Sequence, residues 1–196
     1  MYRSLHAAIR DAEAQGINLA QLALNTEAKD QGRPIEEIRA ALARALGVMR
    51  GGIAQGITGD HRSASGLVGG DAAKLRTGPA GPLGGTVSRD VLMRALAVQE
   101  INAAMGVIVA APTAGGAGVL PAVLSGLADA KGMSDQNLVD ALAVAGLIGA
   151  VVAERASLSG AEGGCQAETG AAAGMAAGAG TEMLGGTPTQ VGDAGG

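Results

Sequence analysis

The sequence predicts an all-α fold, a helical domain with long glycine-rich loops around one buried apolar helix. Apolar residues recur at three- and four-residue spacing, no stretch alternates like a strand, and Gly, Pro, Ser and Asn mark helix ends. With 196 residues, 47% of them hydrophobic, the chain is long enough to bury a core. It has no Phe, no Trp and one Tyr, so the core must consist of Ala, Leu, Val, Ile and Met, with closely approaching backbones.

The first third of the chain predicts three helices. The first is closed by Gly16, the second is opened by Asn18 as its N-cap, and the third is opened by Pro34. We expect residues 1–57 to form an N-terminal helical docking region. The apolar face of its third helix consists of Ile35, Ile38, Leu42, Leu46 and Met49. We interpret the arginines of this region as a solvated surface, with a partner-facing surface as the alternative; they are Arg33, Arg39, Arg44 and Arg50.

Residues 58–196 are predicted to form a catalytic helical core, incomplete at the C-terminus. Residues 58–85 hold eight glycines and two prolines, which indicates a loop with at most a short helix around 71–75. Helix returns with Ser88 as the expected N-cap, breaks at the turn "APTAGGAG" (111–118), and resumes over "VLPAVLSGLADAKG".

The C-terminal part predicts two more helices. Ser134 caps the first, whose uncharged run 141–153 is apolar on every side and should be surrounded by protein. That run has 13 residues, too few to cross a bilayer. The last helix is expected over about 166–184, with Gly185, Gly186 and Pro188 as its stop signal.

Charge and termini exclude several classes of protein. The chain has 14 Lys and Arg against 18 Asp and Glu, a net charge of −4, and no basic run with stacking aromatics, so we expect no nucleic-acid partner. The first residues lack the apolar core and cleavage site of a signal peptide. We therefore expect a cytoplasmic protein without a membrane partner.

The single thiol, Cys165, stands in the glycine-rich stretch "SGAEGGCQAETGAAAG". If a helix begins just after Gly164, the unpaired N–H groups at its start would favour a reactive or metal-bound thiolate. The plainer interpretation is a small buried hydrophobic residue. Gly170, Gly174 and Gly178 follow at four-residue spacing, and each costs about 0.5–1 kcal/mol against Ala in a helix, so something should pack against that face.

Other candidate residues give weaker signals. The turn 111–118 opens a helix and could bind a carboxylate or phosphate through its N–H groups, but its spacing matches neither a Walker A loop nor a dinucleotide fingerprint. His6 is expected on the surface, and His61 is a weak acid–base candidate in the loop. We interpret Glu162 as a loop residue and Glu168 as an acid that complements a helix dipole.

Four motifs carry a resemblance to a known family. They are "SGLVGGDAAKL", "QEINAAMGVIVAAPTAGGAGVLPAVL", "VDALAVAGLIGAVVAERASLSGAEGGCQAETGAAAGMAA" and "GGTPTQV". In this order they resemble the α chain of the bacterial iron-sulfur-dependent L-serine dehydratase, an L-serine ammonia-lyase, over essentially the whole chain. The stretch "SGAEGGCQAE" is the most specific of them.

The resemblance implies a lyase of amino-acid degradation and gluconeogenesis that converts L-serine to pyruvate and ammonia. It implies a four-iron four-sulfur cluster, held by three cysteines, whose open iron acts as a Lewis acid. Two-chain members take part of the serine site and a regulatory domain from a separate β chain. Mapped residue by residue, the resemblance implies that Cys165 is a metal ligand. It implies a substrate segment of Pro112, Thr113, Ala114 and Gly115, with Asn102 as its support. The catalytic base stays unassigned.

Two departures from the family pattern matter. The family often has a hydroxyl residue where this chain has Gly116, and it continues beyond "GGTPTQV" into a segment with two further cysteines, whereas this chain stops at "GDAGG". We therefore expect a C-terminally truncated chain without an intact cluster and without activity on its own. We also expect residues 58–85 and 159–164 to be mobile, and an uncovered face of 141–153 to favour homo-oligomers.

Two other functions stay open at this point. The turn could be the phosphate cup of a pyridoxal-phosphate lyase, with Lys74 as the Schiff-base residue. Alternatively, the chain could be a non-catalytic helical interaction module that uses the glycine face of its last long helix.

Overall fold

The computed structural model describes residues 2–78 and 85–196. Within these residues it contains nine helices and no strand, which confirms the all-α prediction. The helices are α1 (Leu5–Gln15), α2 (Leu19–Gln31), α3 (Ile35–Gly56), α4 (Asp71–Thr77), α5 (Thr86–Ala103), α6 (Val119–Lys131), α7 (Asp135–Arg155), α8 (Gly160–Met183) and α9 (Pro188–Gly195).

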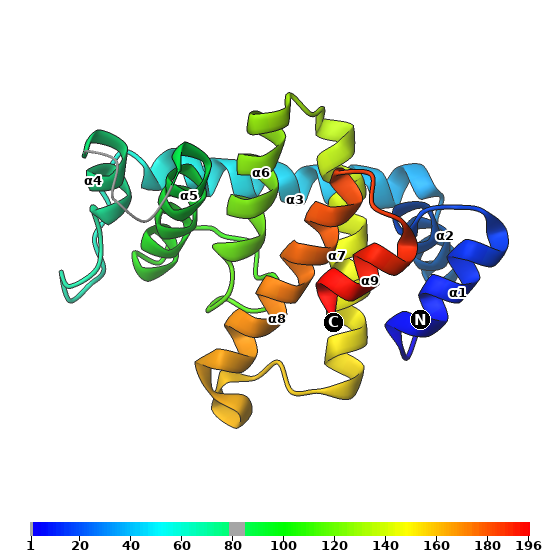
Figure 1. Ribbon diagram of the computed structural model, residues 1–196. Coiled ribbons are helices and arrows are strands. Elements are labelled where there is room, and N and C mark those ends of the chain that lie inside the picture. The colour runs from blue at the N-terminus through cyan, green and yellow to red at the C-terminus, as the bar shows by residue number, and fades with distance from the viewer. Residues whose placement is uncertain (1, 79–84) are drawn as a thin grey trace.

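The long helix α3 links the two ends of the molecule (Figure 1). Helices α1 and α2 lie at one end and α4 and α5 at the other, with α6, α7, α8 and α9 between them. Helix α8 packs against α6, α7 and α9, and α9 also packs against α1. The segments that carry the candidate site are therefore held by the middle of the molecule.

Local chemistry explains most helix ends. Gly16 and Gly32 both have φ of 64°, the left-handed conformation that ends α1 and α2 at little steric cost. The side chain of Asn18 accepts a hydrogen bond from the Gln21 amide at 2.9 Å, and Ser134 forms a capping box with Asn137 at the start of α7. These caps confirm the predicted boundaries.

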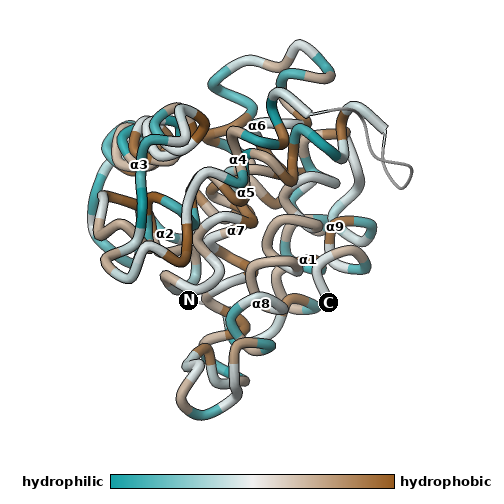
Figure 2. The backbone as a smooth tube through the Cα atoms, turned by 90° about the vertical axis from the view of Figure 1, so that its left-hand side faces the viewer, coloured by the Kyte–Doolittle hydropathy of each residue, from teal (hydrophilic) through white to brown (hydrophobic). Residues whose placement is uncertain are grey.

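Helix α7 lies at the centre of the core. Hydrophobic colour gathers along it and on the neighbouring helices in Figure 2, and hydrophilic colour marks outer turns. One hydrophobic cluster joins residues of α2 and α3 to residues of α6, α7 and α9, including Leu24, Leu46, Leu120, Val144 and Val191. The division at residue 57 stays a prediction, but residues from both sides of it share this cluster.

Most of the apolar run 141–153 is covered by protein. Leu142, Val144, Leu147 and Ile148 are all buried, against the expectation of an uncovered face. By length and composition alone, α7 is the one described helix that could cross a membrane. Its most apolar window is 61% buried inside the protein, as is usual for a core helix, so it is weak evidence for a span.

Helix α8 packs closely through its glycines, as predicted, at two of three positions. A Cβ on Gly178 would lie under 3.0 Å from Ile148 Cδ1, and one on Gly174 would lie 3.0 Å from the carbonyl oxygen of Gly195. A Cβ on Gly170 would meet nothing within 4 Å. Helices α7 and α9 therefore occupy part of the predicted glycine face, while its first position is open.

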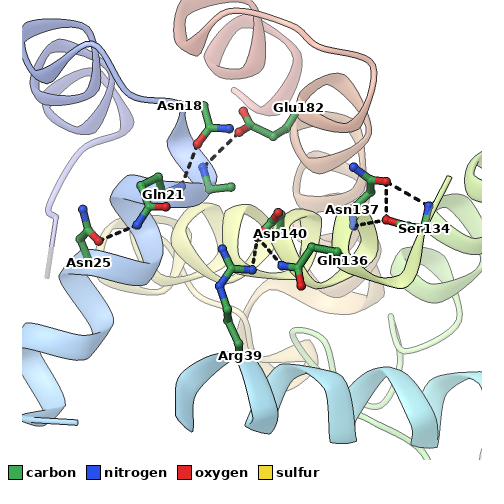
Figure 3. Close-up of polar contacts among 10 residues, drawn as sticks. Asn18, Gln21, Asn25, Arg39, Ser134, Gln136, Asn137, Asp140 and Glu182 are labelled. Carbon is green, nitrogen blue, oxygen red and sulfur yellow. Dashed lines mark hydrogen bonds and ion pairs between the residues drawn. The ribbon is translucent and has the colours of Figure 1, made fainter. Parts of the chain in front are cut away.

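Two of the arginines predicted to be solvated form ion pairs with α7. Arg39 on α3 binds Asp140 at 2.6 Å, as Figure 3 shows, and Arg50 binds Asp135 at 2.6 Å. The hydrogen bonds that Arg50 donates to Asp135 raise the pKa of the Arg50 guanidinium and lower the pKa of the Asp135 carboxyl. Arg50 stays exposed, as predicted, whereas Arg39 is half-buried. The prediction failed for Arg39 because periodicity within α3 contains no information about the acids of α7.

Three helix boundaries differ from the predictions. Helix α5 begins at Thr86, with Gly85 rather than Ser88 as its N-cap, and α8 begins at Gly160 instead of about residue 166. Helix α8 ends at Met183, as the stop signal predicted, but Pro188 also begins a helix that was not predicted, α9. Proline is suited to the first turn of a helix, because an N–H there has no partner within the helix. The short helix predicted at 71–75 is α4, whereas residues 79–84 of the same predicted loop lie outside the described residues.

Candidate functional site

The turn 111–118 is held on one side by the last part of α5. The Asn102 side-chain amide donates to the carbonyl oxygen of Ala114 at 3.0 Å, and Gln99 Nε2 donates to that of Gly115 at 2.6 Å. Asn102 also donates to Gln99 Oε1 at 3.1 Å, which orients both amides. Two side chains one helical turn apart therefore fix two successive carbonyl groups of the turn.

On its other side the turn contacts α8. The Thr113 hydroxyl donates a hydrogen bond to Glu168 Oε2, across 55 positions of sequence. A Cβ on Gly116 would lie 2.9 Å from the carbonyl oxygen of Glu168 and 3.0 Å from the Cβ of Ala172. The glycine at 116 thus permits the turn to approach α8 closely.

Cys165 directly follows a break inside α8. Gly164 has φ of 73° and ψ of 175°, so the helical conformation stops there and starts again at the cysteine. The thiol is exposed, and the Thr169 hydroxyl donates to the Cys165 carbonyl oxygen at 3.0 Å. Cys165 therefore stands at the start of a helical segment, as predicted, although α8 itself begins five residues earlier, with Ser159 as its N-cap.

The structure brings the predicted substrate segment and the cysteine-bearing helix together. Asn102, Thr113, Ala114 and Gly115 belong to one hydrogen-bonded group, and Pro112 precedes them in the same turn, after a cis peptide bond. Cys165 lies one helical turn before Glu168, the residue that contacts this group.

The other candidate residues lie elsewhere. His6 is exposed on α1, and His61 belongs to the loop before α4. The ammonium group of Lys74 pairs with Asp71 at 2.8 Å, on a helix that packs against α5. In residues 2–78 and 85–196, no group of three or more His, Cys, Asp or Glu side chains could hold a metal ion.

Glu168 is the site residue that the sequence analysis missed. We interpreted it as an acid that complements a helix dipole, whereas its carboxylate is half-buried and bonded to the turn. A possible signal is the set of glycines at 115, 116 and 160, since a Cβ at each would lie within 3.0 Å of an atom of Glu168. Their spacing in the sequence does not relate them to one another.

A separate cavity of about 320 Å³ lies between α2, α3 and α7. Its walls include Leu24, Ile38, Leu42, Leu142 and Leu147, and the residues that line it include none of the turn or the cysteine segment. This cavity is therefore distinct from the candidate site.

Comparison with known proteins identifies the family. The family described as "Serine dehydratase alpha chain" matches residues 14–195. The chain belongs to this family. The match includes the turn, Asn102 and Cys165, so these site residues lie within the part of the chain that the family accounts for.

Curated relatives agree with the family. The chain is 39% identical over 198 residues to the probable L-serine dehydratase α chain of Bacillus subtilis, a match that covers 99% of this chain and 65% of the relative. It is 37% identical over 180 residues to the L-serine dehydratase α chain of Peptoniphilus asaccharolyticus, covering 90% and 61%. The L-serine dehydratase of Streptomyces coelicolor is 38% identical over 196 residues, covering 97% and 42%. The chain thus spans 42–65% of the length of these relatives.

Proposed function

We propose that this chain provides the substrate-binding turn and one metal-binding thiol of an L-serine dehydratase. The observation that carries the proposal is the hydrogen-bonded group of Asn102, the turn 111–118 and Glu168, one helical turn from Cys165, in a member of the serine dehydratase α chain family. The curated relatives named above carry the name of this enzyme.

The proposed reaction is the elimination of water from L-serine. A base takes the α-proton, the bond from the β-carbon to the hydroxyl oxygen breaks, and the products are aminoacrylate and water. The aminoacrylate tautomerises to an imine, which water hydrolyses to pyruvate and ammonia. In this scheme the turn orients the serine, and its own position is set by Gln99 and Asn102 from α5 and by Glu168 from α8.

The residues of this chain alone do not fit a four-iron cluster. Such a cluster in this family would need three thiolate ligands, and the sequence has one cysteine. Cys165 is suited to be one of them, because its thiol is exposed and follows the backbone break at Gly164. We propose that the other protein ligands lie outside these 196 residues.

A separate β chain is the proposed partner, because the family is that of an α chain. L-serine is the proposed substrate, and amino-acid degradation and gluconeogenesis in the cytoplasm are the proposed setting. The pyridoxal-phosphate alternative has less support, since Lys74 is exposed, paired with Asp71, and on a helix that packs against α5 rather than α8. The alternative of a non-catalytic module is not favoured by any contact described above.

The test of the proposal is Cys165→Ala in a full-length family α chain that contains these 196 residues, prepared anaerobically and assembled with a β chain. We expect pyruvate formation from L-serine to fall to background, because no other thiol can replace this ligand. Helical content should stay near that of the wild type, because the side chain is exposed and adds little to the core.

Gly170→Ala is the matched control, since it lies on the same helix and its Cβ would meet nothing within 4 Å. It should keep activity. Turnover by the assembled Cys165→Ala variant at the wild-type rate would rule out the proposed role of this thiol.

A further inference from the structure

The carboxylate of Glu168 occupies the space between two backbone segments. A Cβ on Gly115 would lie 2.5 Å from Oε2, and one on Gly160 would lie still closer to Oε1. Real Cβ atoms essentially never come within 3.0 Å of another atom, so neither glycine can take a side chain while Glu168 stays in place. The two oxygens thus face the turn 111–118 and the start of α8.

A hydrogen bond fixes the carboxylate in this space. The Thr113 hydroxyl donates to Oε2, and a bond to a charged acceptor is roughly twice as strong as a neutral one. Glu168 also lies in the first turn after the break at Gly164, where the helix dipole favours a negative charge. Both effects hold the side chain in one orientation.

We propose that Glu168 is a positioning residue, which fixes the turn 111–118 and Gly160 against the segment that carries Cys165. Among the side chains that hold the turn, Glu168 is the one that belongs to the cysteine-bearing helix, so it couples the position of the turn to that of the thiol. Glu168 acts through Thr113 and through the close fit of Gly115, not by direct contact with a reacting atom. The contact itself is independent of the function proposed above, and only its consequence for serine turnover rests on that function.

A double-mutant cycle on the isolated chain tests the close fit. Gly115→Ala should lower the melting temperature by about 3 °C, because its Cβ forces the carboxylate to move and to lose its bond from the Thr113 hydroxyl. In the Glu168→Ala background the same change should have little effect, since the carboxylate is gone. Equal losses in both backgrounds would overturn the proposal. Gly170→Ala, on the same helix as Glu168 and with open space around its Cβ, should change the melting temperature equally in the wild-type and Glu168→Ala backgrounds.

Amide hydrogen exchange of residues 113–118 tests the hydrogen bond. Glu168→Ala should speed exchange in this segment about tenfold while exchange in α7 stays unchanged, since the loss is local. Glu168→Gln keeps the length and one acceptor oxygen and should restore slow exchange. Thr113→Val, which removes the donor and keeps the shape, should speed exchange as much as Glu168→Ala does. The two changes together should give no faster exchange than either alone.

Three exchange results would overturn the inference. Glu168→Ala could leave the exchange rate of 113–118 unchanged, or Glu168→Gln could exchange as fast as Glu168→Ala. The third is that Thr113→Val and Glu168→Ala have additive effects on this rate. If Glu168→Ala does not fold, Glu168→Gln and Thr113→Val still decide between these outcomes. None of the measurements requires serine turnover. If the expected exchange is seen but a full-length parent chain that contains these residues forms no pyruvate with its β chain, Glu168 stays a positioning residue and the proposed function alone is refuted.

Discussion

Glu182 is a half-buried carboxylate where the end of α8 meets the start of α2 (Figure 3). Its Oε1 accepts a hydrogen bond from the Ala20 amide at 3.1 Å, while its buried Oε2 has no partner among the described residues. Burial raises the pKa of this carboxyl above the ordinary 4.5, and the negative charge of Asp140 adds to the shift. The folded chain therefore binds this proton more tightly than the unfolded chain does.

This shift predicts the sign of a pH effect. The contribution of Glu182 to stability should increase as the pH falls from 7 through its raised pKa, and should be complete below about 4.5, where the unfolded chain is protonated too. Glu182→Gln keeps an acceptor for the Ala20 amide but carries no charge. The melting temperature of this variant, relative to the wild type, should therefore rise between pH 4 and pH 7.

Thermal unfolding of both proteins at a series of pH values measures this difference. Asp135 has a lowered pKa because Arg50 bonds to it, so it titrates with the opposite sign, but it is present in both proteins and cancels. If the difference in melting temperature between the two proteins stays constant from pH 4 to pH 7, protonation of Glu182 is not coupled to folding.

At the scale of the element, the crossing of α3 and α5 depends on one glycine. A Cβ on Gly56 would lie within 3.0 Å of the Cα, C and O atoms of Ala97, which are backbone and cannot move aside as a side chain can. Gly56→Ala should therefore destabilise the chain by about 3 kcal/mol, because the two helices must separate. Chemical denaturation measures the loss as a lower midpoint.

Gly47→Ala, on the same helix, is the matched control. Its Cβ would meet nothing within 4 Å, and the position is exposed, so alanine should add about 0.5–1 kcal/mol through its better helix propensity. Equal effects of the two changes would mean that helix propensity, and not the contact with Ala97, decides the stability of α3.

At the scale of the whole molecule, the core is shared by both ends of the chain while the single thiol stays exposed. Because the chain has one cysteine, we expect anaerobic reconstitution with iron and sulfide to load the isolated protein with far fewer than about four irons per chain. It should form no pyruvate from L-serine. Iron analysis beside the lactate-dehydrogenase-coupled assay measures both quantities.

Cys165→Ser provides the comparison for this measurement. Iron that stays bound to this variant is not held by the thiol and is subtracted. Stoichiometric four-iron uptake with turnover in the isolated wild-type chain would show that other residues complete the cluster site.

The sequence alone determined the fold class, most helix ends and the segments of the candidate site. Caps such as Asn18, Ser134 and Gly16 act on amides or carbonyls within about four positions, so the signal and its effect lie in the same short window. The family motifs likewise marked Asn102, the turn 111–118 and Cys165 before any contact between them was known.

Only the tertiary structure decided which residues of distant segments meet. The pairing of Arg39 with Asp140 spans 101 positions, and the bond between Thr113 and Glu168 spans 55. A charged residue on a predicted helix has the same sequence pattern whether water or another segment faces it. Arg39 was therefore interpreted as solvated, and Glu168 as a complement to the helix dipole only. Their partners follow from how α3, α7, α8 and the turn pack, and that packing depends on the fit of side chains and bare glycine backbone across the whole core.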